Sequence, residues 1–169
     1  MKMDFDEKGL SLCKFQAGLF EKSVTATGGS SPFFIKCFMN SEEALHIDMD
    51  GFLSEAEDIE STLGKLKSKH NLERGSIKYS EDSLYWMGYL YRYWCYTYQA
   101  KSRSVYKIIQ AEELHSLYLP YHTLDPGTAI QCFCNMRIHG LYLANDEVAE
   151  SFITYSSCLF CKSGIGICR

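Results

Sequence analysis

The stretch YWMGYLYRYWCYTY, residues 85–98, holds eight aromatic side chains and one charged side chain, Arg92. On a helix, Tyr85, Tyr89 and Tyr93 would share one face, while tryptophan, leucine and methionine would cover much of the remaining circumference. A helix that is apolar on nearly all sides belongs in the interior of a fold, so we expect this stretch to form the central helix of the core. A partner-binding surface is the main alternative. A platform for stacking nucleic-acid bases is disfavoured, because such platforms set their rings among several cations.

The composition is that of a single soluble domain. The chain has 169 residues, of which 46% are apolar and 22% are charged, and its formal net charge is -4. This net charge disfavours nucleic acid as a partner, because the molecule as a whole would repel a phosphate backbone. No window approaches about eighteen uninterrupted apolar residues, so no membrane span is expected. The first ten residues, MKMDFDEKGL, place acids where a secretory signal peptide carries positive charge, and we therefore expect a cytoplasmic protein.

Helical patterns precede the aromatic stretch. Apolar side chains recur every three or four residues from residue 9 to residue 26, which predicts a first helix, and two glycines follow it. Ser31 and Pro32 then predict an N-cap and the first residue of a second helix. Ser41, which precedes two acids, is typical of a helical start, and we expect the helix to bend there and not to stop.

The next segment is strongly charged. Residues 54–75 combine a narrow apolar seam with dense acids and lysines, which predicts a helix on the surface. Its carboxylates could form an acidic pair, but their density is typical of a solvated helical face. Ser80 precedes two acids and predicts the N-cap of the aromatic helix, which we expect to run to about Gln99.

Short helices are predicted after the aromatic stretch, at residues 105–109 and 112–118, and we expect Pro120 to stop the second. Asp125 and Pro126 predict the N-cap and first turn of a last helix. No alternating strand pattern occurs before residue 138, so the predicted fold is all-α, a compact single domain.

The end of the chain differs in character. We expect residues 1–137 to form the helical domain and residues 138–169 to form an irregular, cysteine-rich tail, because no helical period extends beyond Arg137. Five of the eight cysteines lie in the last 38 residues. Four thiolates can bind zinc, and the candidate ligands are Cys132, Cys134, Cys158 and Cys161. Residues two apart on a helix point about 200° apart, which disfavours Cys132 and Cys134 as paired ligands. We predict thiols without a metal and no cofactor.

Arg92 is the most informative ionisable residue, because charged groups are seldom buried without a partner. One interpretation packs its stem in the core and leaves its head at the surface. The other places it in a half-enclosed pocket that would suit an anion such as phosphate. The predicted binding residues are Arg92, Tyr96, Lys107, Tyr121 and His122. No catalytic motif occurs in the sequence, so we predict no catalytic residue.

Three segments carry a resemblance to a known family: SSPFFIKCFMNSEEALHIDMDGFL, YSEDSLYWMGYLYRYWCYTY and VYKIIQAEELHSLYLPYHTLDPGTAI. Together they resemble a family of small, largely uncharacterised proteins of Gram-positive bacteria, over about residues 20–131. Members of this family are encoded beside toxin-like open reading frames, including one that is ADP-ribosyltransferase-like. The family brings no established catalytic residues. Its pattern implies that the protein ends soon after DPGTAIQ, and a shifted reading frame would produce a tail such as residues 132–169.

The resemblance and the absence of catalytic motifs lead to one expected function. We expect a non-enzymatic protein-interaction protein, the antitoxin or accessory component of a toxin–antitoxin operon, whose partner is a protein such as a toxin encoded nearby. The alternative is a phosphate- or nucleotide-binding effector or enzyme that uses a pocket around Arg92.

Overall fold

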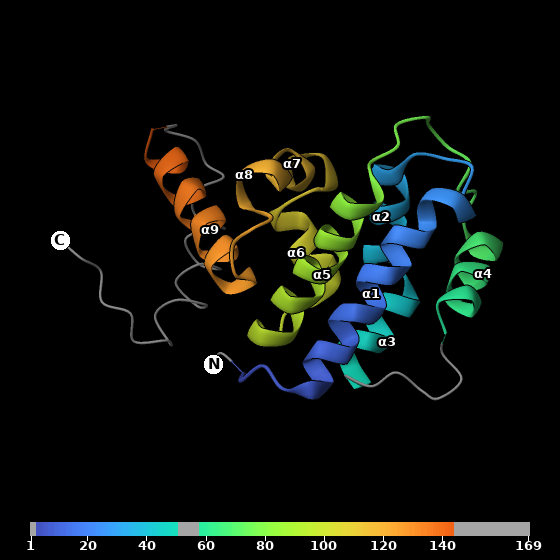
Figure 1. The fold of residues 1–169 in the computed structure, drawn as a ribbon, viewed down its shortest axis with the longest axis horizontal. Coiled ribbons are helices and arrows are strands. Elements are labelled where there is room, and N and C mark those ends of the chain that lie inside the picture. Colours follow the sequence, from blue (N-terminus) through green and yellow to red (C-terminus); the bar gives the residue numbers. More distant parts are fainter. Residues whose placement is uncertain (1–2, 51–57, 144–169) are drawn as a thin grey trace.

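The computed structural model describes residues 3–50 and 58–143, and every regular element in these two ranges is a helix. The helices are α1 (Glu7–Ala26), α2 (Ser31–Met39), α3 (Glu42–Asp50), α4 (Ile59–Lys69), α5 (Glu81–Tyr98), α6 (Ser102–Ile108), α7 (Ala111–Ser116), α8 (Tyr118–Tyr121) and α9 (Pro126–Leu143) (Figure 1). Because no strand occurs in the described ranges, the predicted all-α class is confirmed for them.

The aromatic stretch lies at the centre of the fold, as predicted. Figure 1 shows α5 between α1 on one side and the group of α6, α8 and α9 on the other. The approach of α5 to α1 depends on Gly88, where a Cβ atom would lie 2.6 Å from the Gln16 carbonyl oxygen and 2.8 Å from Ala17 Cα. Close packing of backbones therefore adds to the burial of aromatic side chains in holding these two helices together.

Both ends of α5 are fixed by local hydrogen bonds. Ser80 is the N-cap, as predicted, and its Oγ accepts a hydrogen bond from the Ser83 N–H at 3.3 Å. At the other end Gln99 adopts a left-handed conformation with φ of 52°, which ends the helix. The Met3 N–H donates to the Thr97 carbonyl at 2.7 Å and holds the segment before α1 against the end of α5.

The start of α2 differs from the prediction by one residue. Ser30 flanks the helix and Ser31 is its first residue, so Ser31 is not the N-cap. Instead, Ser31 Oγ accepts a hydrogen bond from the Tyr79 N–H at 3.0 Å, and the Ser31 N–H donates to the Ile77 carbonyl at 2.8 Å. These long-range bonds to residues just before α5 replace the local cap, which no spacing in the sequence could reveal.

The expected bend at Ser41 is a complete break, and that prediction was wrong. Helix α2 ends at Met39, and α3 begins at Glu42 as a separate element. Ser41 Oγ accepts a hydrogen bond from the Ala44 N–H at 3.1 Å, so Ser41 does start a new helix, as its two following acids indicated.

Helix α4 is shorter than the charged segment that predicted it. Asp58 accepts a hydrogen bond from the Ser61 N–H at 2.6 Å and caps the helix, which ends at Lys69 instead of near residue 75. Residues 54–57 of the predicted helix lie outside the described residues. After α4 the chain returns past Ser30, whose N–H donates to the Arg74 carbonyl at 2.8 Å.

Pro120 does not stop the helical path, which corrects the prediction. It lies within the four-residue helix α8, where it is the third residue. The first four N–H groups of a helix have no acceptor within that helix, so proline, which lacks an N–H, is tolerated at the third position.

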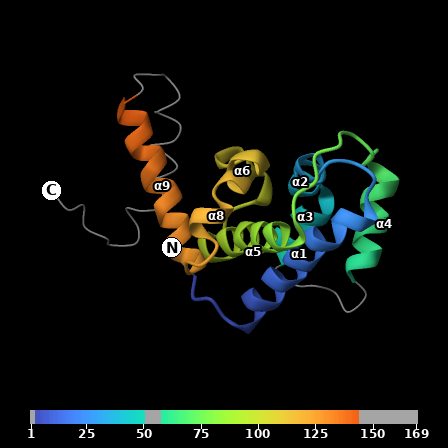
Figure 2. The ribbon, with the colours of Figure 1, turned by 45° about the horizontal axis from the view of Figure 1, so that its top comes forward.

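Helix α9 begins as predicted, because Asp125 Oδ2 accepts a hydrogen bond from the Thr128 N–H at 3.0 Å. Its residues Ala129, Ile130 and Phe133 are buried in the core. The helix continues past Arg137 to Leu143, and Figure 2 shows its far end extending away from the other helices. The part of the predicted irregular tail from residue 144 onward lies outside the described residues. None of the described helices combines the length and apolarity needed to cross a membrane.

Candidate functional site

Arg92 lies inside the fold, where it is 2% exposed. Its Nε donates to Gln16 Oε1 at 2.8 Å, its Nη1 donates to Asp48 Oδ1 at 2.7 Å, and its Nη2 donates to Ser102 Oγ at 3.0 Å. The interpretation that leaves the head of Arg92 at the surface was wrong, because the residue is almost completely buried. Each of its three nitrogens binds a group of the protein itself.

Asp48 is the counter-charge, and its side chain is 4% exposed. Its Oδ1 accepts a second hydrogen bond from Ser102 Oγ at 2.7 Å, and its Oδ2 accepts one from the Ser102 N–H at 2.7 Å. Ser102 is the first residue of α6, whose flanking residue Lys101 makes no side-chain cap. The Asp48 carboxylate on α3 therefore caps α6 from outside and complements the positive end of that helix.

Four residues from four helices form one hydrogen-bonded group, which we name the Arg92 network: Gln16 on α1, Asp48 on α3, Arg92 on α5 and Ser102 on α6. A buried ion pair with such satisfied partners fixes the relative placement of the helices that contribute to it. The network therefore helps to define how the four helices pack against one another.

Two thiols lie near this network. Cys95 Sγ is 3.8 Å from Ser102 Oγ, and Cys13 is buried on α1. Burial raises the pKa of the Cys95 thiol to about 11 and that of the Cys13 thiol to about 12, although the positive charge of Arg92 opposes both shifts. Both thiols are therefore protonated at neutral pH, and neither has the thiolate character of a nucleophile.

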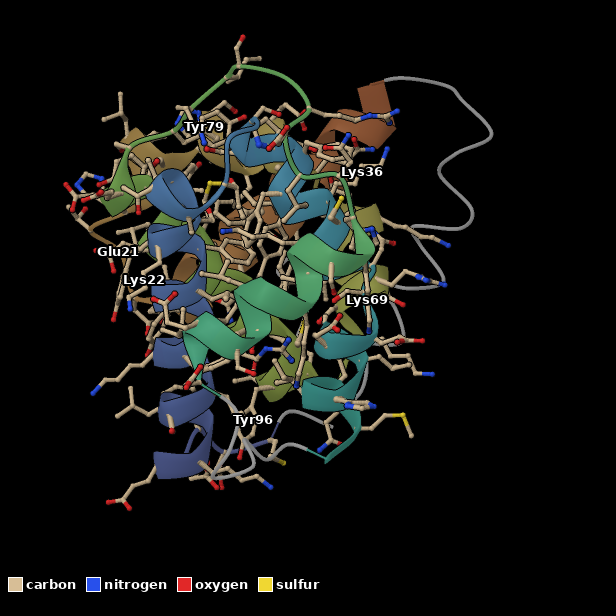
Figure 3. All side chains as sticks on the ribbon, turned by 90° about the vertical axis from the view of Figure 1, so that its right-hand side faces the viewer. Glu21, Lys22, Lys36, Lys69, Tyr79 and Tyr96 are labelled. Atoms are coloured by element: carbon tan, nitrogen blue, oxygen red, sulfur yellow. The ribbon has the colours of Figure 1, made fainter. Side chains whose placement is uncertain are left out.

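The other predicted binding residues make contacts elsewhere in the fold. Tyr96 donates its hydroxyl to Asp6 Oδ1 at 2.6 Å and lies toward the end of the molecule where α1 begins (Figure 3). Lys107 is exposed on α6. Among the described residues, neither Tyr96 nor Lys107 forms a hydrogen bond or ion pair with the Arg92 guanidinium.

Tyr121 is the last residue of α8 and contacts α9, and His122 directly follows α8. The Tyr121 hydroxyl donates to Met136 Sδ at 3.5 Å, and the Tyr121 ring packs edge-on against Phe133 with 5.2 Å between centroids. His122 Nδ1 lies 3.1 Å from the Tyr118 carbonyl oxygen. The hydrogen bonds of the described residues thus do not gather the five predicted binding residues into one site.

The partners of Arg92 could not be predicted from the sequence. Gln16, Asp48 and Ser102 lie 76, 44 and 10 residues away from it along the chain. Asp48 sits in a segment of mixed polarity, so nothing in its surroundings marks it as a buried acid. Only the packing of α1, α3 and α6 around α5 brings these residues together.

Three exposed apolar side chains lie on α8, just after it and on α9. Leu119 is 78% exposed, Met136 is 43% exposed and Leu124 is 39% exposed. Leu119 and Leu124 are close to Tyr121 along the chain, and Met136 accepts its hydrogen bond. We name these residues the α8–α9 apolar surface. Large apolar side chains grouped in this way are typical of a surface that contacts another protein.

The comparisons with known proteins match this chain to no family model, no curated protein and no solved structure. Within residues 3–50 and 58–143, no group of three or more histidine, cysteine, aspartate or glutamate side chains could hold a metal ion. Cys132 and Cys134 lie half-buried on α9. Cys158 and Cys161, the other two candidate zinc ligands, lie outside the described residues.

Proposed function

We propose that this chain is a non-enzymatic interaction protein that binds a protein partner, and that it is the antitoxin or accessory component of a bacterial toxin operon, acting in the cytoplasm. The observation that carries this proposal is the α8–α9 apolar surface. Leu119, at 78% exposed, leaves most of its side chain in water, which is an unfavourable place for it unless another surface covers it.

The buried ion pair supports a structural role for Arg92, the residue around which an anion-binding pocket was considered from the sequence. Arg92 is neutralised by Asp48 and enclosed by Gln16 and Ser102. A phosphate would have to displace the Asp48 carboxylate and leave that charge unpaired in the interior, which is costly. The geometry around Arg92 therefore favours an interaction protein over a phosphate-binding effector or enzyme at this position.

The toxin-operon part of the proposal draws on the resemblance of residues 20–131 to proteins encoded beside toxin-like genes. An antitoxin that works by binding needs a stable scaffold and a surface for its target. The all-α core meets the first need, and the α8–α9 apolar surface meets the second.

Co-expression tests the proposal. The chain is produced together with each product of the genes that flank its own, and growth and co-purification are measured. We expect relief of toxicity and a complex that survives purification. If the chain neither restores growth nor retains any flanking gene product, the antitoxin proposal is refuted.

Surface variants locate the contact. The double variant Leu119→Glu with Met136→Glu places two charges on the α8–α9 apolar surface and should abolish co-purification. Ile77→Glu is the matched control, because Ile77 is 60% exposed but lies in the segment before α5. All variants should keep the helical circular-dichroism spectrum of the original chain. Equal co-purification by both variants would place the contact elsewhere.

A further inference from the structure

A group of cations lies where α2 meets α6. Lys36 is exposed on α2, and exposed Asn40, which directly follows that helix, donates from its side chain to the Lys36 carbonyl at 2.8 Å. Arg103, exposed near the start of α6, donates from Nη2 to the Asn40 carbonyl at 3.3 Å. The start of α6 therefore lies beside the end of α2, and Lys36 and Arg103 belong to one side of the molecule.

Two more cations extend this group. Lys107 is exposed and follows Arg103 by one helical turn, so both point to the same side of α6. The Arg74 guanidinium lies 5.8 Å from the centre of the Phe33 ring, on the first half of α2. We name Lys36, Arg74, Arg103 and Lys107 the cationic face. In Figure 3, Lys36 lies on the outer side of α2, on the same side of the molecule as Lys69 of α4.

The acids near this face do not neutralise it. Helices α2 and α6 contain no acid. On α3, Glu42 and Glu43 both bind Lys69, at 2.8 Å and 2.7 Å, and Asp48 is committed to Arg92. Two acids oppose the face: exposed Glu73, which precedes Arg74 in the chain, and Glu112 on α7, which acts electrostatically on Tyr106 of α6. Four cations against these two acids leave an excess of positive charge on a chain whose net charge is -4.

We propose that the cationic face binds an acidic segment of a protein partner. This inference rests on the proposed function in one respect, which is that the partner is a protein. Residues 33–39 of α2 span about 9 Å, which is long enough to contact a short peptide segment. Half-buried Phe33, Cys37 and Ile108 lie among the cations and supply apolar contact area, as the core of a protein interface does.

Nucleic acid fits the same face less well. A strand of nucleic acid runs on beyond any short patch, and the surrounding surface of this net-acidic molecule would repel its phosphates. The described cationic face also offers no exposed aromatic platform for bases, since Tyr106 is buried and Phe33 is half-buried. Charge complementarity thus favours a carboxylate-rich polypeptide.

A fluorescent peptide of about ten glutamates is the probe, and a thymidine oligonucleotide of about ten nucleotides is its competitor. The test variant Lys36→Glu with Lys107→Glu reverses two charges on the face and leaves the Arg103 hydrogen bond in place. The control Lys8→Glu with Lys14→Glu makes the same change in net charge at two exposed lysines of α1. Anisotropy titrations at low salt measure the Kd of the full-length chain and of both variants.

We expect the face variant to bind the peptide about fivefold or more weakly than the control variant, and we expect binding by the original chain to weaken as salt is raised. Equal affinities of the two variants would overturn the proposal. So would displacement of the peptide by an equimolar oligonucleotide, because the face would then be a nucleic-acid site. Dimer formation by the original chain at low salt, lost in the face variant, would also overturn it in favour of a second copy as occupant.

The peptide measurement is independent of the co-expression test. If the peptide binds as expected but no flanking gene product is retained, the antitoxin identity fails and the cationic face stands. If a flanking product is retained equally by the original chain and the face variant, and the peptide does not bind, the interaction function stands and the cationic face fails.

Discussion

Replacing Asp48 with alanine should be among the most damaging single changes available in this protein. The substitution removes the acceptor of three hydrogen bonds, one from Arg92 and two from Ser102, each 2.7 Å long. It leaves the Arg92 guanidinium in the interior without a counter-charge, which costs about 3–5 kcal/mol. Loss of the cap on α6 adds about 1 kcal/mol. Since a domain is stable by about 5–15 kcal/mol, Asp48→Ala should leave the protein close to unfolding.

A double-mutant cycle separates the ion pair from the packing. Arg92→Met keeps most of the stem volume and removes the charge, and it leaves the Asp48 carboxylate buried with Ser102 as its remaining partner. The double variant Asp48→Ala with Arg92→Met has no unpaired charge in the interior. It should therefore be less destabilised than the sum of the two single variants, by about 2 kcal/mol or more.

The measurement is urea denaturation followed by circular dichroism, with the free energy of unfolding extrapolated to water. If Asp48→Ala does not fold, Ser102→Ala gives a milder probe of the same network, with an expected loss of about 1–3 kcal/mol. The reasoning would be refuted if Asp48→Ala lay within 1 kcal/mol of the original chain, or if the two single changes were strictly additive.

Three further predictions concern other parts of the fold. Gly88→Ala should destabilise the protein by about 1–3 kcal/mol because its Cβ would meet the α1 backbone, whereas Gly64→Ala, with nothing within 4 Å, should be neutral or stabilising; thermal midpoints of the two variants decide. A chain stopped after Arg137 should lose only the helical content of the end of α9 and should melt within a few degrees of the full chain, because the described buried positions of α9, Ala129, Ile130 and Phe133, precede the stop. A sharply lowered midpoint together with stoichiometric zinc in the full chain would contradict this. Alkaline pH should unfold the protein, because burial raises the pKa of Tyr106 to about 12 and that of Tyr91 well above its usual value. Unfolded tyrosines ionise near pH 10, so the stability from these two residues is complete below that pH and falls as the pH rises toward 12. Denaturation midpoints that stay constant from about pH 9 to about pH 11.5 would exclude this.

Local chemistry made much of the fold predictable. The caps at Ser80 and Asp125 are set by residues next to the helices they begin, and the structure has both. The central position of α5 could be predicted because its side chains are apolar around most of the helix. A helix of this kind would expose a large apolar area to water if other helices did not cover it. These predictions depend on neighbours in the sequence, and the structure confirms them.

Two of the predictions that failed depend on partners far away along the chain. Ser31 has the residue type and the following proline of an N-cap, yet its hydroxyl binds Tyr79, 48 residues later. Arg92 was correctly singled out as a charge in an apolar helix, but its counter-charge comes from α3, 44 residues earlier. Sequence periodicity reports which side of a helix is apolar, and it carries no information on which distant polar group that side will meet.

The partnership of α1 with α5 also has a consequence for the protein as it is being made. About 70 residues separate the end of α1 from the end of α5, and a ribosome that adds ~5–20 residues per second needs roughly 4–14 s to synthesise them. During that interval the apolar stripe of α1 has emerged without the helix that covers it. For several seconds the nascent chain therefore exposes apolar surface that α5 covers in the folded protein, and α1 cannot complete its packing until α5 has been synthesised.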